Sequence, residues 1–105
     1  MSRKDINIAK ALKKKLTGLV QILEYKVFGS RARGDAGPYS DLDIFLKVSR
    51  LTKKQKDKIV EAAWEVGFEN HVVICPVIYT KDEVENTPLR SSPLVLVVNE
   101  EGIAV

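Results

Sequence analysis

The chain has 105 residues, 45% hydrophobic and 30% charged, so it can fill and cover the core of a single domain spanning residues 1–105. That balance excludes a disordered chain, and no apolar stretch approaches the roughly 20 residues of a membrane span. Cys75 is the only cysteine, which excludes an internal disulfide and a cysteine-cluster metal site. The lysine-rich start does not resemble a signal peptide, so we expect a cytoplasmic protein.

The net charge of +3 conceals an uneven distribution along the chain. Residues 1–58 carry 15 of the 17 Lys and Arg against 6 Asp and Glu, whereas residues 59–105 carry 2 against 8. The net charge is therefore +9 over residues 1–58 and −6 over residues 59–105. This asymmetry fits an anionic ligand for the first half, a partner of opposite charge, or two solvated helix faces. Composition alone does not choose among these three interpretations.

The first elements follow from the spacing of apolar residues. Spacings of four, four and three predict an amphipathic helix at the start of the chain, formed around Ile8, Leu12, Leu16 and Leu19. Residues 23–28 alternate apolar and charged side chains, which predicts a strand with one buried face. Gly29 ends that strand, and we expect a helical turn to open at Ser30, within a turn-rich loop.

A second strand is predicted over residues 41–48, with Leu42, Ile44 and Leu46 on one face and Asp41, Asp43 and Phe45 on the other. Thr52 and Gln55 have capping-box spacing, so a helix should follow and stop near Gly67. We expect the buried side of this helix to consist of Ile59, Val60, Ala63 and Val66. Trp64 is expected in the core or in an interface, and Cys75 as a small buried group.

The last third of the chain completes the predicted fold. Residues 71–79 are nearly all apolar, as in a central strand, although Pro76 argues against full pairing. Residues 81–86 fit a short helix, 94–98 have strand propensity, and 102–105 fit a closing strand. This order predicts an α/β (α+β) domain, in which helices pack against one small sheet.

Two aspartates stand out for their chemistry. Asp41 and Asp43 are two residues apart in a predicted strand, so their side chains lie on the same face. Two carboxylates at such a short distance raise each other's proton affinity unless a cation lies between them. Mg²⁺ suits such a pair, because it takes one or two carboxylates and completes its octahedron with water and substrate phosphates. The alternative is a solvated strand face at the edge of the sheet.

Gly29 and Ser30 supply the other half of such a site. Glycine lets the backbone approach a ligand closely, and the amides and hydroxyl that follow can point at an anion. Arg31 and Arg33 add positive charge, with Arg33 the better candidate for a phosphate contact; the alternative is surface charge near Asp35. Together these residues fit a metal-bound polyphosphate, and the matching chemistry is phosphoryl or nucleotidyl transfer.

The run Gly29-Ser-Arg-Ala-Arg-Gly34, followed by Asp41-Leu-Asp43, resembles the signature of the DNA polymerase β-type nucleotidyltransferase superfamily. More narrowly, it is similar to the minimal nucleotidyltransferases, the MNT group. The resemblance implies a polymerase-β-like fold with a small mixed sheet. It also implies that Gly29, Ser30 and Arg33 bind the phosphates of ATP or another NTP, and that Asp41 and Asp43 are catalytic and hold two Mg²⁺ ions.

One part of the family pattern is missing. Family enzymes carry a third carboxylate on a neighbouring strand, and the matching strand here is 71–79, where the expected position falls near Cys75 or Val77. Neither residue is acidic. Glu69 and His71 share the parity of those positions but lie at the start of the predicted strand, so they are weak substitutes. The resemblance also favours a helix over 92–101, against the strand propensity of 94–98.

The function that the resemblance implies is Mg²⁺-dependent transfer of a nucleoside monophosphate, AMP from ATP, to a hydroxyl of an acceptor. Because the chain is short, it has little room for a domain that binds the acceptor, and we expect a second chain to complete the site. That chain is a separately encoded helical protein of the HEPN type, as in toxin–antitoxin pairs, or another copy in a homo-oligomer. The alternative is an inactive nucleotide-binding or partner-binding module that lacks the third carboxylate. A nucleic-acid-binding domain is the weakest hypothesis, because no aromatic residues interleave with the lysines.

Overall fold

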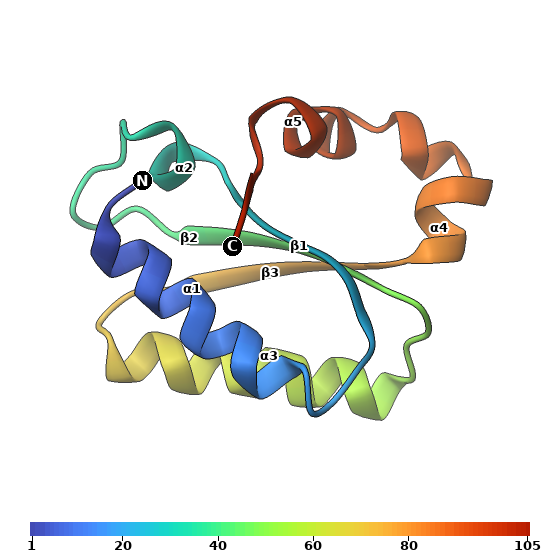
Figure 1. Ribbon diagram of the computed structural model, residues 1–105, viewed down its shortest axis with the longest axis horizontal. Helices are drawn as coiled ribbons and strands as arrows, with labels where there is room; N and C mark the ends of the chain where they lie inside the picture. Colours follow the sequence, from blue (N-terminus) through green and yellow to red (C-terminus); the bar gives the residue numbers. More distant parts are fainter.

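The centre of the computed structural model, which describes residues 1–105, is a four-stranded mixed sheet with helices packed against it (Figure 1). The strand order is β3-β2-β1-β4, with β1 antiparallel to β2 and β4, and β2 parallel to β3. In chain order the elements are α1 (Arg3–Leu16), β1 (Ile22–Phe28), α2 (Ser30–Arg33), β2 (Leu42–Val48), α3 (Lys53–Glu69), β3 (Ile74–Thr80), α4 (Lys81–Asn86), the 3₁₀ helix η1 (Pro88–Ser91), α5 (Pro93–Glu101) and β4 (Ile103–Ala104). The predicted α/β (α+β) class with a small mixed sheet is confirmed.

Hydrophobic side chains lie on both faces of the sheet. The larger cluster joins α1 and α3 to one face, and its centre includes Leu12, Ile44 and Ile59, each fully buried. On the other face, Phe28 and Phe45 pack beneath Val98 of α5. The sheet therefore has α1 and α3 on one side and α5 on the other (Figure 1). None of the helices combines the length and apolarity that a membrane crossing requires.

Strand β1 departs from the predicted alternation at its first residues. Tyr25 and Val27 are buried as expected, but Leu23 is 39% exposed. The reason is an irregularity in the pairing with β2, where the register shifts between Ile22 and Glu24. A bulge of this kind turns a side chain away from the face that simple alternation assigns to it.

The capping box of α3 is confirmed. The Thr52 hydroxyl accepts from the Gln55 N–H at 3.1 Å, and the Gln55 side chain accepts from the Thr52 N–H at 2.9 Å. The expected stop at Gly67 is wrong, because α3 continues to Glu69. Gly67 lies inside the helix, where a Cβ would stand 2.4 Å from the Val72 carbonyl oxygen, so it allows the returning chain to pass closely.

The exposed side of α3 differs from the prediction. Val60, expected in the core, is 48% exposed, and Trp64 is 67% exposed. Ala62 faces the core in place of Val60, whereas Ile59, Ala63 and Val66 are buried as expected. The small side chains of the two alanines let α3 lie close to the sheet. Of the two interpretations of Trp64, the core is therefore wrong.

Strand β3 lies at the edge of the sheet and is paired only with β2, so the expectation of a central strand is wrong. The Val73 carbonyl accepts from the Leu42 N–H at 2.8 Å. Because these groups alternate sides along a strand, the nitrogen of Pro76 faces the open edge, where no donor is needed. The expectation from Pro76 that the strand is not fully paired is confirmed, and of the seven residues of β3 only Ile74 is buried.

The C-terminal segment forms a helix rather than the strand that its β-branched residues suggested. Pro93 occupies the first turn of α5, and the Ser92 hydroxyl accepts from the Val95 N–H at 3.2 Å. Val95 and Val98 are buried at helical spacing. Capping and packing therefore outweigh β propensity here, and the helix expected from the family resemblance is confirmed.

Candidate functional site

The turn after β1 lies directly against β2. Phe28 is the register partner of Asp43, so Gly29 and Ser30 follow immediately beside the aspartate. Gly29 has a φ of +80°, and a Cβ at this position would stand 2.5 Å from Oδ2 of Asp43. Both its conformation and its surroundings require glycine. The structure thus brings the Gly-Ser turn and the Asp-x-Asp pair together.

Asp43 and Asp41 differ in exposure. Asp43 is half-buried and Asp41 is exposed. Burial raises the pKa of Asp43, and the charge of Asp41 raises it further, whereas Arg33 lowers it. A carboxylate in this environment is stabilised by a bound cation. The oxygen donors of the pair fit Mg²⁺, which needs only one or two protein carboxylates when phosphates and water supply the rest.

The four residues of α2 continue the turn. Its N-cap is Gly29, and its C-cap is Gly34, which has a left-handed φ of +87° and donates its N–H to the Ser30 carbonyl at 3.0 Å. As at the start of any helix, the first N–H groups of α2, beginning with Ser30, have no acceptor within the helix. They add partial positive charge near Asp43.

Arg31 and Arg33 have different environments. Arg31 is half-buried and donates to Oδ1 of the buried Asp5 and to the Ser40 carbonyl, each at 2.8 Å, so it ties the loop to α1. Arg33 is exposed and pairs with Asp35 at 3.2 Å and Glu101 at 3.4 Å, and both contacts raise its pKa. In this structure Arg33 is therefore a surface charge paired with Asp35, as the alternative interpretation expected. Of the two arginines, however, only the exposed Arg33 is accessible to a ligand.

The position beside Asp43 on the neighbouring strand is Cys75. Its Sγ donates to Oδ2 of Asp41 at 3.4 Å, and burial together with this carboxylate raises the pKa of Cys75 to about 11. It is half-buried rather than fully buried as expected. The register therefore places Cys75, not Val77, directly beside Asp43, and the group there is a thiol that stays neutral at neutral pH.

The two weak substitutes do not lie on the strand. Glu69 is the last residue of α3 and is exposed, and His71 follows in the turn with a φ of 57°. Their expected place at the start of the strand is wrong, because α3 extends two residues beyond Gly67. Nowhere in the chain do three His, Cys, Asp or Glu side chains lie close enough together to hold a metal ion.

Sequence reasoning missed two acidic residues of this region. Asp5 holds Arg31 from α1, and Glu101 reaches Arg33 from the end of α5. These partners are 26 and 68 residues apart in the chain. No local motif carries such pairs, although an acidic residue on the apolar side of the first predicted helix was a usable signal for Asp5.

Comparisons with known proteins show the family to which the chain belongs. A family model described as nucleotidyltransferase domain matches residues 6–100. A protein of Methanocaldococcus jannaschii, named "Putative protein adenylyltransferase", is 36% identical over 91 residues, which cover 77% of this chain and 92% of the relative.

Solved structures share the fold. A chain in the crystal structure of a toxin–antitoxin with AMP-PNP has a TM-score of 0.62 at 21% identity, over 98% of this chain and 72% of that one. A chain of the tri-AMPylated Shewanella oneidensis HEPN toxin in complex with MNT antitoxin has a TM-score of 0.53 at 20% identity, over 96% and 70%. At such identities the likeness concerns the fold.

Proposed function

Since the chain belongs to the nucleotidyltransferase domain family, we propose that it transfers AMP from ATP to a hydroxyl group of an acceptor protein. The observation that carries this proposal is the contact between Gly29 and Asp43. It joins a turn suited to phosphates to carboxylates suited to a metal ion, at one end of the sheet.

In this proposal each residue has a distinct role. Asp41 and Asp43 hold Mg²⁺, which neutralises phosphate charge when bound. Gly29 and Ser30 present backbone N–H groups and a hydroxyl to the phosphates. Arg33 contacts a phosphate after exchanging its weak, exposed pairs with Asp35 and Glu101, which cost little to break.

The proposed reaction balances without a covalent enzyme intermediate. The acceptor oxygen bonds to the α-phosphorus of ATP, the bond from that phosphorus to the bridging oxygen breaks, and pyrophosphate leaves. The hydroxyl proton is released to water, because the thiol of Cys75, with its raised pKa, is already protonated at neutral pH and cannot accept it. The chain itself contributes binding, orientation and electrostatic stabilisation.

The acceptor is proposed to come from another chain. The relative carries the name "Putative protein adenylyltransferase", and one structural neighbour comes from a complex of an AMPylated HEPN toxin with MNT antitoxin. By analogy, we propose a helical HEPN-type protein as partner and acceptor in a toxin–antitoxin pair.

Cys75 favours a second candidate function. A thiol beside Asp43 is protonated at neutral pH and supplies no general base, and its soft sulfur is a poor ligand for Mg²⁺, which prefers oxygen. A chain with such a site binds metal and nucleotide but transfers AMP slowly or not at all, and acts through its partner. This candidate shares every binding role with the first and differs only in turnover.

Incubation with ATP labelled at the α-phosphate, Mg²⁺ and a HEPN-type protein tests the proposal. We expect label on the acceptor, and its loss in Asp41→Asn and Asp43→Asn. The matched control is Asp57→Asn, which makes the same change at an exposed position on α3. ATP labelled at the γ-phosphate should leave the acceptor unlabelled, because that phosphate departs with pyrophosphate. Nucleotide binding without transfer to any acceptor would support the inactive module instead.

A further inference from the structure

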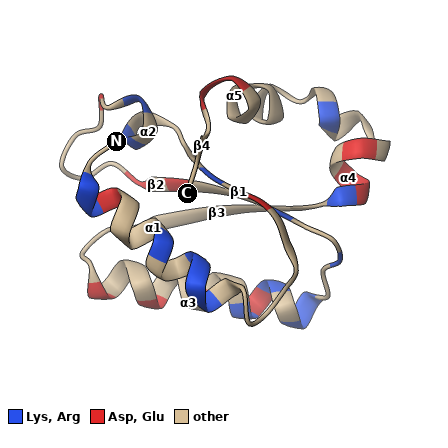
Figure 2. Cartoon of the chain, viewed as in Figure 1, with Lys and Arg blue, Asp and Glu red and all other residues tan.

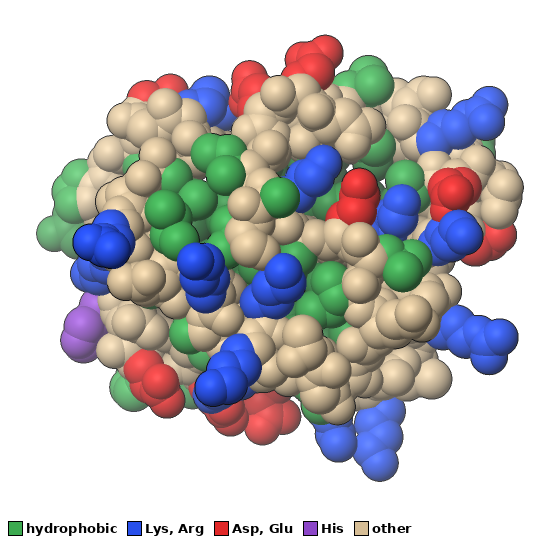
Figure 3. All heavy atoms as spheres, in the orientation of Figure 1, with side chains coloured by type: hydrophobic (Ala, Val, Ile, Leu, Met, Phe, Trp, Pro, Cys, Tyr) green, Lys and Arg blue, Asp and Glu red, His purple; other side chains and the backbone are tan.

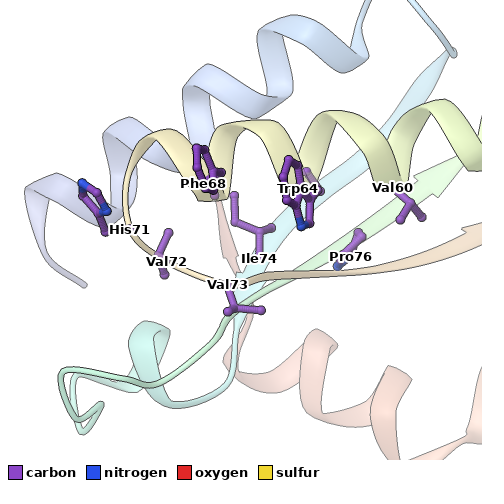
Figure 4. Close-up of a pocket in the computed structure, with 10 residues that line it drawn as sticks. Val60, Trp64, Phe68, His71, Val72, Val73, Ile74 and Pro76 are labelled. Atoms are coloured by element: carbon purple, nitrogen blue, oxygen red, sulfur yellow. The ribbon is translucent and has the colours of Figure 1, made fainter.

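An apolar groove of about 460 Å³ runs between α3 and the open edge of β3, on the face of the sheet away from Asp43 (Figure 4). Trp64 and Phe68 line it and stack on each other, with ring centroids 5.3 Å apart and planes at 12°. Their exposed fractions are 67% and 70%, and Val60 and Val73 add 48% and 64%. So large an exposed apolar patch marks an interaction surface.

The shape and edge of the groove favour a helix as its occupant. An added strand needs the outward N–H groups of β3, and Pro76 removes one of them in the middle of the edge. Val60, Trp64 and Phe68 stand four residues apart and form one ridge along α3. A second helix can pack along such a ridge and place its own apolar side chains in the groove.

Charges beside this ridge have a distinctive order. Exposed Lys54 and Lys58 come first, and exposed Glu61, Glu65 and Glu69 follow on the same side of α3. Figure 2 shows the helix mainly blue toward its start, with one red segment among the blue where exposed Asp57 lies, and red toward its end. Figure 3 shows a similar order along the lower edge of the molecule. When two copies of α3 pack antiparallel, these stripes face each other, and each basic half meets an acidic half.

The order of charges works against α3 as an isolated helix. Lysines near a helix start and glutamates near its end oppose the macrodipole, at a cost of a few tenths of a kcal/mol for each exposed charge. The first turn of α3 holds no acidic residue and the last turn no basic one. Helix stability therefore gives no reason for this pattern, whereas self-pairing does.

We propose that two copies of this chain associate through a two-fold, antiparallel pairing of α3, with Trp64 and Phe68 of each copy in the groove of the other. A surface that complements itself under a two-fold axis is what a symmetric dimer requires. Ile74 and Pro76 line the groove, whereas Cys75 between them points to the other face. Pairing thus leaves Asp41 and Asp43 open, and dimerisation is independent of the proposed transfer activity.

Analytical ultracentrifugation of the full chain across a range of concentrations tests the pairing. We expect a monomer–dimer equilibrium, and in Trp64→Asp a dissociation constant raised about thirtyfold or more, as for an interface hot spot. Leu96→Asp is the control, because Leu96 is 50% exposed on α5, away from the groove. A wild-type chain that stays monomeric at every concentration, or a dimer unaffected by Trp64→Asp, overturns the proposal.

Charge exchange tests the antiparallel order. One variant carries Lys54→Glu and Lys58→Glu, and the other carries Glu61→Lys and Glu69→Lys; Glu65 is left in place because it pairs with Lys15 at 3.7 Å. Each variant alone brings like charges together and should be monomeric. An equimolar mixture should form heterodimers that dissociate in high salt. A mixture no more associated than its components contradicts the pairing, whatever the transfer assay shows.

Discussion

Gly29 and Asp43 constrain each other at the scale of single residues. The Asp43 carboxylate occupies the space that a side chain at position 29 would need, and it is half-buried against the glycine backbone. Burial and the neighbouring Asp41 raise the pKa of Asp43, so the ionised form is held at a cost that a cation relieves. The proposed binding of Mg²⁺ and phosphate therefore depends on one close backbone contact.

Cys75 gives the sharpest prediction at this scale. Cys75→Asp places a carboxylate beside Asp43, where the family resemblance leads us to expect a third one. If the chain is a slow transferase, AMP transfer should rise about a hundredfold, the usual contribution of a general base. Single-turnover transfer of α-labelled ATP measures it. Cys75→Asn has nearly the same shape without the charge, so equal rates in the two variants would refute a role for the carboxylate.

Individual site residues could be predicted only where a motif is local. Gly29, Ser30, Asp41 and Asp43 lie within 15 consecutive residues, and strand periodicity alone implies that the two aspartates share a face. The contacts Asp5–Arg31 and Glu101–Arg33 join residues 26 and 68 apart, which no local pattern encodes. For the same reason the sequence left Cys75 and Val77 undecided, because only the register between β2 and β3 separates them.

Among the elements, α1 and β1 are joined by a buried hydrogen bond. The Tyr25 hydroxyl donates to the Ala9 carbonyl at 2.6 Å, and burial raises the pKa of Tyr25 far above its usual range. The folded chain therefore keeps this tyrosine neutral where the unfolded chain ionises it, above about pH 10. In that range the unfolded state binds fewer protons, so the free energy of unfolding falls as pH rises.

Tyr25→Phe tests this contact. At neutral pH the variant should lose about 1 kcal/mol of unfolding free energy, because the hydrogen bond from the Tyr25 hydroxyl to the Ala9 carbonyl is lost while that carbonyl keeps its bond within α1. Above about pH 10 the difference from the wild type should narrow, because phenylalanine cannot ionise. Urea unfolding across this pH range measures both effects. A difference that is constant with pH would show that Tyr25 ionises without penalty in the folded chain.

Whether an element could be predicted depended on how local its cause is. The capping box of α3 and the short helix α4 follow from neighbouring residues and were predicted. The edge position of β3 depends on which strands exist elsewhere in the sheet, so apolar composition alone gave the wrong answer. In α5, the packing of Val98 against Phe28 and Phe45 outweighs the strand propensity of the segment. Only the family resemblance predicts this helix.

Across the whole molecule, the uneven charge has three separate explanations. Part of the positive charge lies around α2, beside the proposed phosphate site. Most of the lysines form the solvated faces of α1 and the start of α3 (Figure 2). Glutamates at the end of α3 supply part of the negative half, where the proposed pairing uses them. Of the three interpretations open at the sequence, the structure shows the solvated helix faces, whereas the anionic ligand and the oppositely charged partner stay predictions.

Global stability reports on binding without regard to turnover. Mg²⁺ with ATP at about 100 times its dissociation constant should add ~2.7 kcal/mol, which raises Tm by about 10 °C in a chain of this size. Asp41→Asn should remove the shift, and Asp57→Asn should keep it. Differential scanning fluorimetry measures both. A wild-type Tm that does not respond to Mg²⁺ and ATP together would exclude the transferase and the binding module alike.

The reversed charges of α3 also bear on how the chain folds. Helix α1 carries Asp5 in its first turn and Lys13, Lys14 and Lys15 in its last, in agreement with its macrodipole, whereas α3 carries the opposite arrangement. Helices form early when their own turns support them and late when they depend on tertiary contacts. Folding should therefore begin with α1 docking on the β1–β2 hairpin, and α3 should join once the sheet offers it a surface.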